Sequence, residues 1–505
     1  MDSQYRTELP ELPLITLDTT LSELYRKASP RNAHKNIIQV LCGVNSGLEL
    51  NSNFPRNAKY LYQDGPFNSV PKKELTADNT ELQRSLAIKY LSLIPQRDAF
   101  ICGNAKVAFF NLDESSEAAK HDRQEVQATI EALDPSQRPQ LVFCRGPEMI
   151  PDVDEKTDLV AYKLAVDGLQ KYPLTIDLET HWFLNTKAAL ATSGLPTPSA
   201  KIIEITGYSP PPDTRCVHCK ASEAIYIQSG CVGNRSLWVT RHKQEIIEAI
   251  GKHPLPFVVK NQQSFGGAGT YVITTEDEKR ELITDFDKEV LPKLLAHVTV
   301  VNHHLNPATI IISDMVKDAI GDYGITFFVT ENDDPIFLAV SQQMIDDNSA
   351  WIGSIINYQE QDELKARFVP IMRQTAAWLR KHGYYGPVGA DILETAPRDG
   401  ENNLNIVDLN VRTSGSLCLP LLRRHFTSRG LHCASSFSIA VEGSRADFLR
   451  RWKEDFEAGR MCILSWYEDR TAGESLADLA VGGEGEEELK QGIDKVRAMT
   501  KKVTF

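Results

Sequence analysis

Apolar and polar residues alternate along two stretches in the second half of the chain, Gly389–Leu393 and Leu404–Asn410. A period of two is typical of a β-strand with one buried face and one polar face. The segment between them, Thr395–Asn403, is polar and contains proline, aspartate and glycine, which favour turns. The pattern therefore predicts a β-hairpin over this region.

Polar residues with metal-binding and phosphate-binding chemistry share one face of the second predicted strand and its continuation. Asp408, Asn410 and Arg412 alternate there with apolar residues, and Asp391 lies on the neighbouring strand. Carboxylate and amide oxygens suit hard cations such as Mg²⁺, and arginine forks onto phosphate or carboxylate oxygens. A solvated strand face is the alternative for this motif alone, but a second motif upstream favours a binding site.

That upstream motif is a short apolar strand, Pro256–Lys260, which ends in a lysine. A loop with Gly266, Gly267 and Gly269 follows it, and a second strand is predicted after the loop. Backbone N–H groups of such a loop can approach phosphate oxygens, and the strand-end lysine adds positive charge. The spacing is neither that of a Walker A loop nor that of the dinucleotide-binding fingerprint. A flexible hairpin turn is the alternative for the loop taken alone.

The first 180 residues mix apolar strands with helical stretches. The predicted strands are 36–41, 106–110 and 140–144, and residues 122–133 are predicted to be helical. Such alternation is typical of an α/β domain.

The last part of the chain carries helical apolar spacing and dense charge over Arg445–Ala458 and Glu486–Met499. We therefore expect a mostly helical C-terminal region.

Between these parts, residues 180–420 resemble the ATP-grasp superfamily, and the motifs occur in the family's order. Lys260 with the loop from Ser264 to Gly269 is similar to the family's strand-end lysine and flexible glycine-rich loop. Asp391 followed by Asp408–Arg412 is similar to its acidic residue and its Glu/Asp-x-Asn-x-Arg strand. Position 408 carries aspartate where the family more often has glutamate. The resemblance implies a nucleotide bound between two α+β lobes.

Two weaker correspondences extend the resemblance. Lys187, on a predicted helix, is similar to a second phosphate-facing lysine of the family, with a solvated helix lysine as the alternative. The stretch Thr309–Val316 is similar to the strand and hinge that grip adenine, which makes Asp314 and Val316 candidates for backbone contacts. Asp322 is either a ribose ligand or an acidic turn residue.

The resemblance implies a domain order along the chain. The expected parts are an N-terminal α/β pre-ATP-grasp domain (1–180), the small lobe with its glycine-rich lid (181–315), the large lobe with the metal site (316–420) and a C-terminal helical region (421–505). This organisation also resembles the pheganomycin-type branch of peptide ligases.

The activity implied by the resemblance is that of an ATP-dependent carboxylate–amine ligase, which activates a carboxylate as an acylphosphate and couples it to an amine. A small-molecule kinase of the same fold and a non-catalytic ATP-binding module are the alternatives. Arg412 and Lys260 would be catalytic, and Asp391, Asp408 and Asn410 would hold one or two Mg²⁺ ions, with Mn²⁺ as a substitute. The expected ATP-binding residues are Lys187, Lys260, Ser264, Gly266, Gly267, Gly269, Asp314 and Val316.

Composition narrows the class of protein further. The chain has 505 residues and a formal net charge of −13, and a phosphate-backbone binder would normally show a basic face. The N-terminus does not resemble a signal peptide, and no apolar run approaches the ~18 residues that a membrane-spanning helix needs. We therefore expect a cytoplasmic enzyme that acts on small molecules and has no nucleic-acid or membrane partner. Self-association stays open. Cys216 and Cys219 have the spacing of zinc ligands, but a polar insertion loop is the favoured interpretation.

Overall fold

The computed structural model describes most of the chain. The described residues are 9–41, 57–64, 92–110, 117–204, 234–265, 269–296, 298–345, 351–397, 403–470 and 473–498. Two features expected from the sequence lie outside them: the loop residues 266–268, which include Gly266 and Gly267, and the cysteine pair Cys216 and Cys219. No described helix has the length and apolar character needed to cross a membrane.

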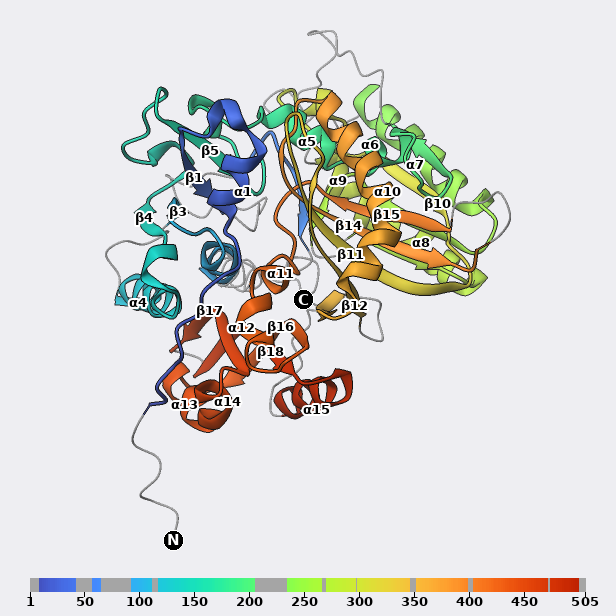
Figure 1. Ribbon diagram of the computed structural model, residues 1–505. Helices are drawn as coiled ribbons and strands as arrows, with labels where there is room; N and C mark the ends of the chain where they lie inside the picture. The colour runs from blue at the N-terminus through green and yellow to red at the C-terminus, as the bar shows by residue number, and fades with distance from the viewer. Residues whose placement is uncertain are drawn as a thin grey trace.

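The N-terminal part is a parallel four-stranded sheet flanked by helices (Figure 1). Its strands, in the order β4-β3-β1-β5, are β1 (Asn36–Val40), β3 (Lys106–Phe110), β4 (Gln140–Cys144) and β5 (Asp158–Tyr162). The helices are α1 (Leu21–Ala28) and α4 (Glu117–Glu131), and residues 92–100 are also largely helical. Ile38 and Val160 in the central strands are fully buried, as expected of a parallel sheet covered on both faces. The predicted α/β class of this part is confirmed.

The next part is an antiparallel sheet covered by helices. Its strands, in the order β6-β10-β7-β9, are β6 (Ala200–Ile203), β7 (Phe257–Asn261), β9 (Thr270–Ile273) and β10 (Ile310–Asp314). The helices are α5 (Leu178–Leu184), α6 (Lys187–Thr192), α7 (Asn234–Lys252), α8 (Glu276–Asp285) and α9 (Leu291–Ala296). Phe257 and Ile310 on the sheet pack with Phe286 from the helical side in one apolar core. A short strand β8 (Ser264–Phe265) leaves this sheet and pairs in parallel with β2 (Gln63–Asp64) of the N-terminal part.

An eight-stranded sheet, ordered β15-β14-β11-β12-β13-β16-β18-β17, forms the rest of the molecule. Its first five strands are β11 (Ala319–Val329), β12 (Ile336–Ile345), β13 (Trp351–Asn357), β14 (Gly386–Thr395) and β15 (Leu404–Asn410). Helix α10 (Gln361–Lys381) lies across one face of these strands (Figure 1) and buries Phe368 and Ala376. The predicted hairpin is present as β14 and β15.

The C-terminal region contains helices where the apolar spacing predicts them. The predicted stretches contain α13 (Arg445–Arg451), α14 (Lys453–Glu457) and α15 (Glu486–Arg497). Two short helices that were not predicted precede them, α11 (Cys418–Leu421) and α12 (Arg423–Thr427). The expectation of a mostly helical region nevertheless missed three long strands, β16 (Cys433–Glu442), β17 (Met461–Asp469) and β18 (Glu474–Gly483). Buried serine and alanine in β16, such as Ser435 and Ser436, hide the alternation that marks a half-buried strand.

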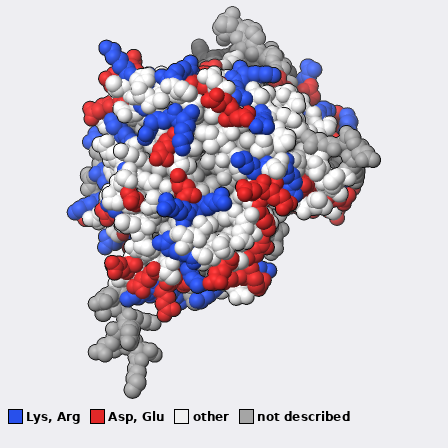
Figure 2. Space-filling view, viewed as in Figure 1, with Lys and Arg blue, Asp and Glu red and all other residues white. Residues whose placement is uncertain are grey.

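The parts share their cores. One apolar cluster joins Val160 of β5 to Val388 of β14, and another joins Val107 of β3 to Leu464 of β17. Acidic and basic side chains are interspersed over the face seen in Figure 2. The N-terminal sheet is thus fixed against the large sheet by burial, which is the dominant favourable term in such packing.

Candidate functional site

The hairpin places the predicted metal ligands side by side. In its register Asp391 on β14 faces Asp408 on β15, and Gly389 faces Asn410. A bulge follows Asp391 in the pairing, and such bulges re-aim side chains next to functional sites. Asp322, expected to be either a ribose ligand or an acidic turn residue, lies within strand β11 beside this hairpin, so the turn alternative is wrong.

The two aspartates differ sharply in charge state. Burial, with the nearby Asp408 and Asp322, raises the pKa of Asp391 to about 7. Burial acts on Asp408 in the same direction, but Lys187 and Lys260 outweigh it and the pKa of Asp408 is lowered. Two carboxylates that repel each other in a buried place bind a proton or a cation. Oxygen ligands of this kind fit Mg²⁺ or Mn²⁺.

Two lysines from different elements reach the same hairpin. Lys187 at the start of α6 is nearly buried and donates to Asp408 Oδ1. Lys260 on β7 donates to the carbonyl oxygen of Val407 at 2.5 Å. Burial lowers the pKa of Lys260, against the raising influence of Asp408. The structure therefore brings both predicted phosphate-binding lysines to the predicted metal ligands.

Arg412 is held by an asparagine that the sequence did not point to. Asn185 Oδ1 accepts from Arg412 Nη1 and from the backbone N–H of Val411, each at 3.0 Å. His181 Nε2 lies 2.9 Å from the Val411 carbonyl oxygen. Burial lowers the pKa of Arg412. The guanidinium is thus positioned by the junction of α5 and α6, next to Lys187.

The other described residues predicted to bind the nucleotide are Ser264, Gly269, Asp314 and Val316. The structure gives their positions but no side-chain contact that joins them to the acidic hairpin. Gly269 has a φ of 72°, a left-handed conformation that glycine adopts without strain. Ser264 begins β8, whose backbone pairs with β2. Asp314 ends β10, its backbone N–H donates to the Ser199 carbonyl oxygen, and Val316 follows two residues later. The adenine-binding role of Asp314 and Val316 stays a prediction.

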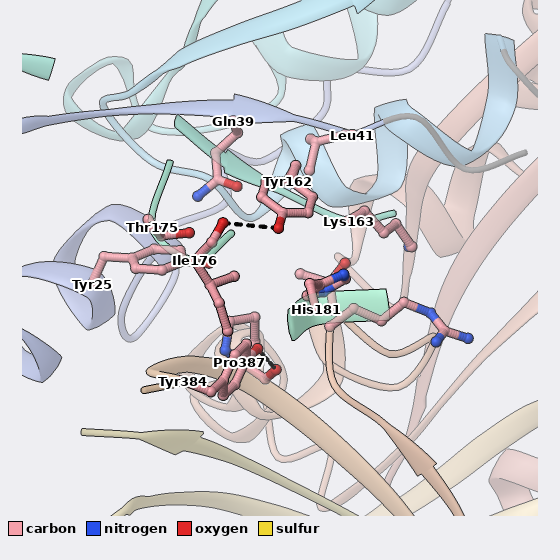
Figure 3. Close-up of a pocket in the computed structure, with 12 residues that line it drawn as sticks. Tyr25, Gln39, Leu41, Tyr162, Lys163, Thr175, Ile176, His181, Tyr384 and Pro387 are labelled. Atoms are coloured by element: carbon pink, nitrogen blue, oxygen red, sulfur yellow. Dashed lines mark hydrogen bonds between the residues drawn. The ribbon is translucent and has the colours of Figure 1, made fainter. Parts of the chain in front are cut away.

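A buried charge cluster joins the N-terminal part to Arg412. Lys163, directly after β5, lies 2.5 Å from Asp98 Oδ2, and Thr413 donates to the same oxygen at 2.8 Å. Burial lowers the pKa of Lys163 to about 8. Figure 3 shows Lys163 entering from the N-terminal side of a small pocket and His181 from the other side, and Arg412 is among its lining residues.

Sequence reasoning missed Asp98 and Lys163. Lys163 had a usable signal, because it follows an apolar strand just as Lys260 does. Asp98 had none, since its partner lies 65 residues away in the chain.

Another group of possible metal ligands among the described residues is His121, Glu125 and Glu468, where α4 packs on β17. Arg445 Nη1 lies 3.5 Å from Glu125 Oε2, and the Arg445 backbone N–H donates to Glu468 Oε2 at 3.3 Å. Arg445 already supplies positive charge to this group, so we assign no metal there.

Two lysines, from helix α6 and strand β7, meet the acidic hairpin β14–β15, as the resemblance to ATP-grasp enzymes leads us to expect. Residues 238–410 match the family model described as L-aspartate–L-methionine ligase, ATP grasp. Over these residues the chain is similar to ATP-grasp enzymes that couple a carboxylate to an amine, which supports the class expected from the sequence. The matched family model is not described as a pheganomycin-type peptide ligase. The expected resemblance to that branch therefore stays a prediction.

Solved structures of low identity align over most of the chain. An ADP complex of N5-carboxyaminoimidazole ribonucleotide synthetase is 13% identical over 97% of this chain and 98% of its own, with a TM-score of 0.47. The same type of enzyme from Staphylococcus aureus, complexed with ADP, is 11% identical over 91% and 97%, with a TM-score of 0.45. Phosphoribosylamine–glycine ligase from Thermotoga maritima is 12% identical over 92% and 97%, with a TM-score of 0.46. A comparison with curated protein sequences found no match.

Proposed function

We propose that the enzyme activates the carboxylate of an amino acid or small peptide-like acid as an acylphosphate and transfers the acyl group to an amine. The observation that carries this proposal is the meeting of Asp391 and Asp408 with Lys187, Lys260 and Arg412 at one hairpin. Acylphosphate chemistry needs positive charge around the transferring phosphoryl group and little covalent help from the protein.

Each residue has a distinct role in this scheme. Asp391, Asp408 and Asn410 would hold one or two Mg²⁺ ions, which neutralise phosphate charge. Lys260 and Lys187 bind the phosphates of ATP, so Lys187 exchanges its Asp408 contact for a phosphate oxygen. Burial strengthens the attraction of each lysine for a phosphate because the local dielectric constant is low.

Arg412 acts on the acid substrate. A substrate carboxylate oxygen attacks the γ-phosphorus, the bond to ADP breaks, and an acylphosphate forms. Arg412 stabilises the charge of this intermediate, since its guanidinium matches phosphate and carboxylate oxygens. The amine nitrogen then attacks the acyl carbon and gives up a proton. The bond from the acyl carbon to the phosphate oxygen breaks, so inorganic phosphate leaves with that oxygen and the amide remains.

The acid substrate is proposed to be an amino acid, and the matched family directs the first choice to L-aspartate as the acid and L-methionine as the amine. Arg412 and Lys163 lie close enough for their charges to interact, and an arginine fork suits the carboxylate of such a substrate.

The test is ADP release from the purified protein with pairs of amino acids, followed by mass analysis of the products. We expect ADP release to require both an acid and an amine, and the product to have their summed mass less one water. A stable phosphorylated acid formed without any amine would instead identify a kinase. Binding of Mg-ATP without ADP release from any pair would instead identify a non-catalytic ATP-binding module.

A further inference from the structure

A chain of hydrogen bonds crosses the large sheet and ends on Asp391. The indole N–H of Trp351 donates to Gln343 Oε1 at 2.7 Å, and the hydroxyl of Ser354 donates to the same oxygen at 3.2 Å. At its other end, Gln343 Nε2 donates to Asp391 Oδ1 at 2.8 Å. Trp351 and Ser354 lie on β13, Gln343 on β12 and Asp391 on β14.

The two donors on Oε1 settle which way the Gln343 amide points. An amide oxygen accepts and an amide nitrogen donates, so the nitrogen must be the end that faces Asp391. A side chain whose orientation is fixed at one end loses little freedom when it bonds at the other. Gln343 therefore meets Asp391 as a pre-oriented donor.

The backbone between Gln343 and Asp391 is shaped to let this contact form. Strand β11 lies between β12 and β14, and Gly324 on β11 is the register partner of Asp391. A Cβ at Gly324 would lie 2.5 Å from Gln343 Nε2. Any larger residue would close the route across β11, so the contact depends on this glycine.

The same chain touches the segment that follows Arg412. A Cβ at Gly415 would lie 2.5 Å from Cη2 of Trp351, so the indole packs directly over that backbone. Trp351 is thus held between Gln343 and the residues after Arg412.

We propose that Gln343 is a positioning residue that orients Asp391 for the metal of the ATP site, and that Trp351 and Ser354 hold Gln343 in the donating orientation. This inference rests on the proposed function, in which Asp391 is a metal ligand. Partners that orient metal ligands in this way commonly change metal affinity by about 10–100-fold when they are removed.

The test is the binding of Mn²⁺ to the protein in the presence of ATP, measured from the enhanced relaxation of water protons by protein-bound Mn²⁺, which Mn-ATP free in solution does not produce. Gln343→Met keeps the length of the side chain and removes the donor, and it should weaken Mn²⁺ binding by about 10-fold or more. The matched control is Gln342→Met, because Gln342 is the exposed neighbour on the opposite face of β12. It should bind Mn²⁺ as the wild type does.

A second variant tests the inference independently in case Gln343→Met does not fold. Trp351→Phe removes the indole donor and keeps a ring over Gly415, so it should weaken Mn²⁺ binding in the same direction and by less. Thermal unfolding of each variant shows whether the fold is kept. Unchanged Mn²⁺ affinity in a folded Gln343→Met or Trp351→Phe protein would overturn the inference and leave the proposed function standing. If the wild type binds no Mn²⁺ with ATP, both the inference and the proposed function fail.

Discussion

Asp391 and Asp408 lie opposite each other on neighbouring strands, yet one holds its proton to neutral pH and the other loses it early. The asymmetry arises because Lys187 and Lys260 outweigh burial at Asp408. At Asp391, burial and the nearby carboxylates Asp408 and Asp322 outweigh the lowering effects of Lys187 and Gln343. Such paired but unequal carboxylates cost stability when no cation is bound, and that cost is expected at a functional site.

Because the unequal carboxylates lower the stability of the metal-free protein, Asp391→Asn should change that stability in a pH-dependent way. The raised pKa means that folded Asp391 keeps a proton which the unfolded chain releases above its ordinary pKa of 3.8. The wild type therefore loses stability as the pH rises from about 4 to about 7. Asp391→Asn removes this loss, so it should be more stable at pH 8 by on the order of 1–3 kcal/mol. It should also be inactive.

Urea unfolding in EDTA between pH 4 and pH 8 checks this. The difference between variant and wild type should grow up to pH 7 and then level off. A constant difference across the range would contradict the charge assignment of Asp391.

Lys260 gives a second prediction at this scale. Lys260→Ala should weaken Mg-ATP binding by about 10-fold or more, since a charged hydrogen bond contributes roughly 1.5–3 kcal/mol. Lys260→Arg should restore only part of the affinity, because the longer planar guanidinium fits poorly where a compact ammonium lies. Calorimetric titration measures both, with Lys201→Ala as the control. Lys201 is an exposed lysine on β6 of the same sheet, and wild-type affinity in Lys260→Ala would remove its assigned role.

At the scale of elements, strand and hairpin patterns led correctly to β14, β15 and the strand-end lysine, because these elements bury one face and carry chemistry on the other. The same reasoning could not find β16–β18, whose faces are both covered and whose small residues do not alternate clearly. It also missed Gln343, whose contact with Asp391 exists only once β11 separates β12 from β14. The order of strands in a sheet depends on contacts between distant parts of the chain, and local periodicity does not predict it.

The buried pair formed by Asp98 and Lys163, which directly follows β5, supports a prediction about stability. Breaking the buried pair with Asp98→Asn or Lys163→Met should destabilise the fold by about 3–5 kcal/mol, because one charge is left buried without its partner. The double variant should recover part of that loss. Urea unfolding of all three gives the coupling energy.

The surface pair Asp277 and Arg280 serves as the comparison. Asp277→Asn should change stability by less than about 1 kcal/mol, since exposed ion pairs contribute little. If Asp98→Asn is as harmless as Asp277→Asn, the buried Asp98–Lys163 pair does not contribute to the stability of the fold.

At the scale of the whole molecule, the C-terminal strands continue the large sheet and share its core. β13 pairs with β16, and Leu464 and Ala480 lie in the same apolar cluster as Val107 of the N-terminal sheet. The described residues of the region expected from the sequence as helical, 421–505, therefore share one sheet and one core with the rest of the molecule.

A chain that ends at residue 420 tests this. It should lose cooperative unfolding and aggregate, because β13 becomes an unpaired edge and the shared core is opened. Differential scanning calorimetry and size-exclusion chromatography check the outcome. A monomeric truncated protein with a single sharp transition would show that the C-terminal region is an independent addition.

The central claim is that a carboxylate is activated as an acylphosphate before the amine attacks. The most direct measurement is the mass of the phosphate released when the acid substrate carries ¹⁸O in its carboxylate. The account predicts that one ¹⁸O atom passes into inorganic phosphate for each amide formed, because the attacking oxygen stays with phosphorus when the acyl group leaves. Amide formation with unlabelled phosphate, or with AMP and pyrophosphate as products, would contradict it.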